Sequence, residues 1–140
     1  MKPIAYALTA FLGLITIGIG GMYFTLGPGF LVLGGGFDFG PIAGTPAYAA
    51  VDSSLRFFAG LWLAMGLCLF YCLGDFANRT TMLRLMMLGF FLGGIGRLIS
   101  MAQFGVLEPM IVPTLIELVI PPIVVVLQSR MARSEITANA

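Results

Sequence analysis

The N-terminal part of this chain contains one long stretch without a charged residue. No Asp, Glu, Lys or Arg occurs between Lys2 and Asp38. About 20 mostly apolar residues in a helix are enough to cross a hydrocarbon core of roughly 30 Å. Only 9% of all residues are charged, whereas ordinary soluble domains carry about a quarter, so polar side chains are too few to cover a soluble globule. The sequence therefore predicts an integral membrane protein.

Four segments are long and apolar enough to be spanning helices: residues 4–25, 53–73, 81–101 and 109–128. The third cannot avoid a charge, because only 12 residues separate Arg84 from Arg97, which is about 18 Å of helix and too short to span. A full third span therefore encloses Arg97, and the fourth encloses Glu117. We expect four crossings.

Basic and acidic residues outside these segments alternate along the chain. Basic residues precede the first segment, lie between the second and third or in the first turn of the third, and follow the fourth: Lys2, Arg79, Arg84, Arg130 and Arg133. The other two connections hold the acids Asp38, Asp52 and Glu108. Cytoplasmic connections of membrane proteins collect Lys and Arg. We therefore predict an all-α membrane protein, a four-helix transmembrane bundle in a single domain over residues 1–140, with both termini in the cytoplasm.

The connection between the first two spans, residues 25–52, is long and apolar. It contains the run Phe30-Leu31-Val32-Leu33, three consecutive glycines, and two prolines at Pro41 and Pro46. A loop of this length without structure of its own is unusual in a compact protein. We expect an ordered apolar Gly/Pro-rich cap on the outer end of the bundle, built as a short strand pair or as a re-entrant segment.

Four charged residues fall in the outer half of the membrane. Helix arithmetic puts Arg97 about 8 Å below the outer surface and Glu117 about 11 Å below it. Asp52 and Arg56 lie four apart near the outer end of the second span, so they share one helix face. Charges in lipid are costly and usually pair. We predict one buried cluster of these four residues, in which Arg97 pairs with Glu117 and Asp52 with Arg56. The cluster is either a structural clamp that holds the second, third and fourth spans in register or a ligand-binding site.

Two prolines, Pro121 and Pro122, stand in the middle of the fourth span. Proline lacks an N–H, and its ring clashes with the carbonyl four residues earlier, which for Pro121 is that of Glu117. The sequence predicts a helix break here. A broken helix beside an intramembrane carboxylate is typical of transporter binding cavities, and a packing kink satisfied by a neighbouring helix is the alternative.

Several kinds of chemistry are disfavoured. The sequence has no His, which excludes imidazole metal ligation and His general-base catalysis. Cys68 and Cys72 lie four apart rather than in a Cys-x-x-Cys motif, and we expect them to pack as small apolar side chains. No phosphate loop, dinucleotide fingerprint or nucleophile elbow is present. A net charge of +1 gives no basic surface for nucleic acid. We predict no metal, no cofactor and no nucleic-acid partner.

Small residues in two of the spans predict a close helix contact. Gly89 and Gly93 have the spacing that lets two membrane helices approach closely, and the first span contains Gly13, Gly18, Gly20 and Gly21. We expect the first and third spans to pack against each other.

Three motifs resemble the signature of one family: Val51-Asp52-Ser53-Ser54-Leu55-Arg56-Phe57-Phe58-Ala59-Gly60-Leu61, Gly93-Gly94-Ile95-Gly96-Arg97-Leu98-Ile99-Ser100 and Glu117-Leu118-Val119-Ile120-Pro121-Pro122. The family comprises small four-helix bacterial membrane proteins catalogued as a domain of unknown function, and the resemblance covers nearly the whole chain. It implies a multi-pass protein of the bacterial cytoplasmic (inner) membrane and assigns no activity. Leu-Arg-x-x-x-Gly at Arg56 also resembles the second-helix pattern of the DoxX-like proteins, some of which are accessory subunits of membrane oxidoreductases.

Three classes of function fit these features. The protein binds a small amphipathic ligand, lipid or quinone-like, or serves as an accessory subunit of a membrane complex, through the cluster of Asp52, Arg56, Arg97 and Glu117. The second class is an isomerase- or hydrolase-type membrane enzyme with Glu117 as proton carrier, for which no nucleophile constellation is present. A small proton-coupled transporter is the third class, and it lacks the expected internal repeat. Membrane lipids are the expected partners in every class.

Overall fold

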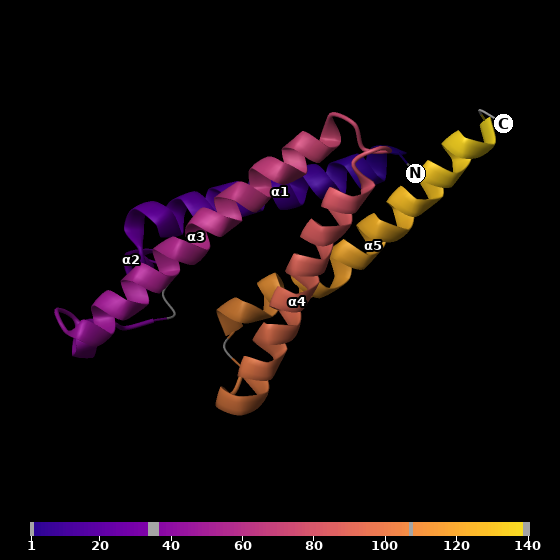
Figure 1. Cartoon of the computed structure of the whole chain (residues 1–140). Coiled ribbons are helices and arrows are strands. Elements are labelled where there is room, and N and C mark those ends of the chain that lie inside the picture. The colour runs from indigo at the N-terminus through magenta and orange to yellow at the C-terminus, as the bar shows by residue number, and fades with distance from the viewer. Residues whose placement is uncertain (1, 34–36, 107, 139–140) are drawn as a thin grey trace. The chain divides into compact units, whose positions relative to one another are not determined.

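Helices account for nearly all of the regular structure in the computed structural model (Figure 1), which describes residues 2–33, 37–106 and 108–138, with side chains as far as residue 132. These residues form the following elements: α1 (Lys2–Leu26), α2 (Pro28–Leu33), the 3-10 helix η1 (Gly40–Ile42), α3 (Pro46–Leu73), α4 (Thr80–Phe104) and α5 (Glu108–Ala138). Helices α1, α3, α4 and α5 are each long and apolar enough to cross a membrane. The predicted all-α class and the four predicted spans are confirmed at this level.

Helix α3 begins at Pro46, well before the predicted start at residue 53. Thr45 precedes it, and the Thr45 hydroxyl accepts a hydrogen bond from the backbone N–H of Tyr48 at 3.3 Å. Threonine is a favoured N-cap residue, and proline is tolerated at the first helical residue because the N–H there has no helical partner. The Thr45-Pro46 pair is therefore a start signal, and it moves Asp52 and Arg56 into the interior of the helix.

Helix α5 runs without interruption from Glu108 to Ala138, past the predicted end at residue 128. Pro121 and Pro122 lie inside it, and Pro121 is fully buried. The predicted break therefore does not interrupt the helical backbone. If the helix ended at the prolines, further backbone N–H and C=O groups would lack hydrogen-bond partners in an apolar environment. A helix that continues through both prolines avoids this cost.

The connection between α1 and α3 contains the short helices α2 and η1 where a strand pair was one of two expectations. Gly34, Gly35 and Gly36 lie outside the described residues. Around them, the Phe37 and Phe39 rings stack with their centroids 6.3 Å apart. The Phe39 and Tyr48 rings meet edge to face, with their centroids 6.2 Å apart. The described part of the connection is therefore helical and aromatic, and its role as an outer cap stays a prediction.

The chain divides into two compact units. One, the hairpin unit, contains Met1–Leu12 and Cys68–Ala140, and the other, the loop unit, is Gly13–Leu67. Helices α4 and α5 pack side by side in the hairpin unit (Figure 1). Its buried core draws on α1, α3, α4 and α5: Ala5, Leu12, Leu69, Cys72, Phe76, Leu83, Met87, Val124 and Met131. Cys72 is fully buried there as a free thiol, which agrees with the predicted packing role, whereas Cys68 is free and half-buried.

Glycines allow close helix contacts within each unit, with partners other than those predicted. In the loop unit, a Cβ on Gly20 would lie 3.2 Å from the Ala59 carbonyl oxygen, so α1 approaches the backbone of α3. In the hairpin unit, a Cβ on Gly94 would lie 2.8 Å from Leu118 Cγ of α5. The first span therefore uses Gly20 against the second, and the third uses Gly94 against the fourth. The expected close contact between the first and third spans stays a prediction.

Candidate functional site

Arg97 of α4 and Glu117 of α5 form an ion pair within the hairpin unit. Arg97 Nε donates to Glu117 Oε2 at 2.8 Å, and Arg97 Nη1 donates to Met110 Sδ at 3.2 Å. The Glu117 side chain is only 10% exposed and that of Arg97 is 27% exposed. The predicted pair is therefore present, and it joins the two neighbouring helices with its carboxylate buried.

Two consecutive glycines make room for this carboxylate. A Cβ on Gly93 would lie 3.7 Å from Glu117 Oε2, and one on Gly94 would lie 3.1 Å from Glu117 Cβ. Any larger side chain at Gly94 would meet Cγ and Cδ2 of Leu118 and Cβ of Glu117. The motif Gly-Gly-x-Gly-Arg thus brings α5 close enough for Arg97 to reach across to Glu117.

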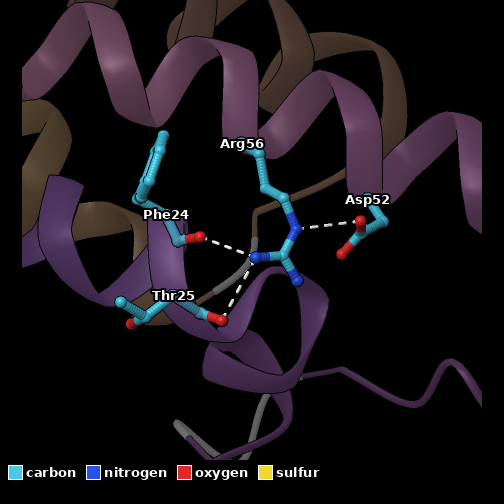
Figure 2. Close-up of polar contacts among 4 residues, drawn as sticks. All are labelled: Phe24, Thr25, Asp52 and Arg56. Carbon is cyan, nitrogen blue, oxygen red and sulfur yellow. Dashed lines mark hydrogen bonds and ion pairs between the residues drawn. The ribbon is translucent and has the colours of Figure 1, made fainter.

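The second pair, Asp52 and Arg56, lies in the loop unit on one face of α3. Arg56 Nε donates to Asp52 Oδ2 at 2.9 Å, and Arg56 Nη1 donates to the backbone carbonyls of Phe24 at 2.6 Å and Thr25 at 3.1 Å. Figure 2 shows the guanidinium between the carboxylate and the last turn of α1. This pair is more exposed, at 41% for Arg56 and 29% for Asp52. Its guanidinium caps the C-terminus of α1.

The chain at the end of α1 explains why Arg56 binds there. The Gly27 N–H still reaches the Tyr23 carbonyl at 2.9 Å, but the next helical donor, for the Phe24 carbonyl, would be Pro28, which has no N–H. Carbonyls at a helix C-terminus carry partial negative charge and favour a cation. Gly27 has a φ of +56°, and a Cβ on it would collide with the Asp52 carboxylate. The sequence Gly27-Pro28 therefore both ends the helix and leaves a carbonyl for Arg56.

The structure thus brings together Asp52 with Arg56 and Arg97 with Glu117. The two pairs belong to different units, so the single four-residue cluster stays a prediction. Each guanidinium already binds groups of the protein itself. The assignment of these four residues to a ligand also stays a prediction.

Sequence reasoning missed a polar network at the opposite end of the hairpin. Gln128 is fully buried and its Nε2 donates to Thr80 Oγ1 at 2.6 Å. Arg84 Nη2 donates to Gln128 Oε1 at 3.3 Å and to Ser129 Oγ at 3.0 Å. One feature of the sequence could have indicated this network. The fourth predicted span ends on a glutamine that is followed by a serine, and the third contains an arginine near its start.

A groove of about 370 Å³ lies beside this network, on the α4–α5 pair. Of the described residues, Arg84 is the one charged residue that lines it, and the other lining residues are apolar: Met87, Leu88, Phe91, Pro121, Pro122, Val125 and Val126. Both prolines of α5 therefore line the groove. None of Asp52, Arg56, Arg97 and Glu117 lines it.

Comparison with known proteins places the chain in one family. Residues 4–128 match the family model described as "Domain of unknown function (DUF4345)". No curated protein and no solved structure matches the chain. The likeness of the Arg56 motif to the DoxX-like proteins stays a prediction. The matched residues reach from the first of the four apolar helices to the last, and this chain belongs to the DUF4345 family over nearly its whole length.

Proposed function

We propose that this protein is a non-enzymatic multi-pass protein of the bacterial cytoplasmic membrane that binds a small amphipathic molecule in the groove on α4 and α5. The observation that carries the proposal is the composition of the groove, with apolar walls and one guanidinium. Ligand sites in proteins are mostly apolar, with a few polar groups that fix the orientation of the ligand. A molecule with an apolar body and a polar head matches that lining.

The size and course of the groove support this assignment. Its volume of about 370 Å³ lies within the range of roughly 300–1,000 Å³ that small-molecule sites occupy. Leu88 and Val126 line it and are 51% and 50% exposed, so the groove opens to the surroundings of the helix pair. In a membrane these surroundings are lipid, and an apolar chain can enter sideways without crossing water.

The geometry gives less support to the other functions, which are an enzyme, a transporter and an accessory subunit. An enzyme or transporter that used Glu117 as proton carrier would first have to release it from Arg97, whose Nε lies 2.8 Å away. An accessory role in a larger complex remains compatible with ligand binding, because a subunit can hold a lipid at its surface. Ligand binding is therefore the proposal, and co-purification of other chains at fixed stoichiometry is the observation that would add the accessory role.

Two valines of α5 give a matched test. Val126 lines the groove, whereas Val119 does not, and they are 50% and 51% exposed. The protein and its variants Val126→Trp and Val119→Trp are purified in a mild detergent with mixed phospholipids, and retained lipid is counted by native mass spectrometry. We expect Val126→Trp to lose retained lipid and Val119→Trp to keep it. Equal retention in all three proteins would refute the groove as the binding site.

We also propose that both termini face the cytoplasm. Asn78 lies in the connection between α3 and α4, and Ala43 in the connection between α1 and α3, and both are exposed. In a background of Cys68→Ala and Cys72→Ala, an impermeant maleimide added to the periplasmic side should label Ala43→Cys and leave Asn78→Cys unlabelled. The reverse pattern would invert the topology.

A further inference from the structure

We infer that the groove selects an anionic phospholipid, with the lipid phosphate bound by Arg84 and one acyl chain along the apolar walls. This inference rests on the proposed function and adds the chemical class of the ligand. Among the residues that the structure describes, Arg84 is the only charged one that lines the groove, so it determines which headgroup the groove accepts.

Arg84 carries an uncompensated positive charge in the described part of the chain. Its two side-chain partners, Gln128 Oε1 and Ser129 Oγ, are neutral acceptors. The ion pairs found among the described residues involve the other two arginines of the helix interiors, Arg56 and Arg97. A guanidinium whose partners are all neutral attracts an anion.

The network behind Arg84 holds the guanidinium in place. Gln128 is fully buried, and its amide nitrogen donates to Thr80 Oγ1 at 2.6 Å, which turns its carbonyl oxygen toward Arg84. Only Nη2 of Arg84 is used for these contacts. Nη1 and Nε are bound to no group among the described residues. A guanidinium presents its donors as a planar fork that matches two oxygens of a phosphate.

The level of Arg84 along the helix fits a phospholipid. Arg84 lies one turn inside the start of α4 at Thr80, and Phe91, at the other end of the groove on α4, lies about 10 Å further along the helix axis. The polar end of the groove is therefore close to the level of the lipid headgroups, and its apolar end extends into the hydrocarbon region. A phospholipid has the same order along its length, with the phosphate at the headgroup level and the acyl chain in the hydrocarbon region.

The test compares lipid preference in charge variants at this end of the hairpin. Wild type, Arg84→Gln, Arg84→Lys and Arg130→Gln are each offered equal amounts of phosphatidylglycerol and phosphatidylcholine, and the retained lipids are counted by native mass spectrometry. Arg130 is exposed and does not line the groove, so its variant controls for general surface charge. We expect wild type to prefer phosphatidylglycerol about fivefold, as one basic residue near an anionic lipid allows. Both lipids carry a phosphate, but only phosphatidylglycerol has a net negative charge, so the preference follows from the positive charge at position 84 and not from the shape of the guanidinium. Arg84→Gln should therefore lose this preference, and Arg84→Lys and Arg130→Gln should keep it.

The outcomes separate this inference from the proposed function. Wild type that retains lipid without headgroup preference overturns the inference and leaves groove binding intact, whereas equal retention by Val126→Trp refutes the groove itself. Equal loss of preference in Arg130→Gln and Arg84→Gln would assign the effect to surface charge. In a second trial, wild type is offered equal amounts of oleate and phosphatidylglycerol, and stronger retention of oleate would assign the groove to a fatty acid. Either result overturns the inference. If Arg84→Gln does not fold, Arg84→Lys with a preference restored to the wild-type level supports it, and Arg84→Lys without preference overturns it.

Discussion

The Arg97–Glu117 pair joins two helices, whereas the Asp52–Arg56 pair lies within one helix and reaches the backbone of another. In the first, the guanidinium binds a carboxylate that is 10% exposed and a methionine sulfur at 3.2 Å. In the second, it binds a carboxylate that is 29% exposed and two backbone carbonyls at the end of α1. An arginine paired with an acidic residue thus makes a side-chain contact between helices in one unit and a helix cap in the other.

This difference determines what each partner contributes. Removing either member of the buried pair leaves the other charge uncompensated in an apolar environment. At the cap, Arg56 has carbonyl partners that do not depend on Asp52, so the two residues are not equivalent. We therefore expect symmetric losses at the first pair and asymmetric losses at the second.

The largest effect is expected for single substitutions at the buried pair. Arg97→Met and Glu117→Leu should each destabilise the protein by about 3–5 kcal/mol, because the remaining charge stays buried without its partner. The double variant should be more stable than either single variant, since no unpaired charge is left. Thermal unfolding in detergent, followed by circular dichroism, measures all three.

If the two single losses instead add up in the double variant, the side chains do not depend on each other, and the contrast with the cap disappears.

A smaller effect is expected where the two helices of the buried pair approach each other. Gly94→Ala should destabilise the protein by about 1–3 kcal/mol, as overpacking does, because its new Cβ would lie 2.8 Å from Leu118 Cγ and 3.1 Å from Glu117 Cβ. Gly96→Ala is the control, because nothing lies within 4 Å of a Cβ there. Similar midpoints for the two variants would show that α4 and α5 can separate at Gly94 without loss.

The smallest effect is expected at the cap. Arg56→Met should lower the thermal midpoint by less than Gly94→Ala does, because it removes contacts to the Phe24 and Thr25 carbonyls at a partly exposed helix end. Asp52→Asn should lower it less again, since Arg56 keeps both carbonyls. Adding Asp52→Asn to Arg56→Met should bring no recovery of stability. A double variant more stable than Arg56→Met would mean that the cap behaves like the buried pair.

The sequence was sufficient to predict the four apolar helices and both ion pairs. Span lengths follow from the hydrocarbon thickness, and the cost of an unpaired charge in lipid leaves few alternatives to Arg97 with Glu117. The start of α3 was also readable, because Thr45-Pro46 is a cap followed by proline. Spacing of apolar residues alone put this start too late.

The cap and the groove were not predictable in the same way. The carbonyl partners of Arg56 depend on how α1 ends at Gly27 and on which residues of α3 face that end. The groove depends on how the side chains of two separate helices fill space around Pro121 and Pro122. Gln128 was read as the polar end of a span, since only the packed hairpin brings it to Thr80 and Arg84.

The ion pair between α4 and α5 also has a consequence for biosynthesis. Helix α4 reaches the membrane before α5 does, and a lone arginine inside a helix costs about 2.5–3.5 kcal/mol during insertion by the translocon. Glu117 follows Arg97 by 20 residues, so its helix arrives while α4 is still near the insertion site. The two helices are therefore expected to move into lipid as one hairpin. A chain that stops after residue 106 should insert α4 less often than the full chain, as reporter glycosylation in microsomes would measure, and Arg97→Met should restore its insertion.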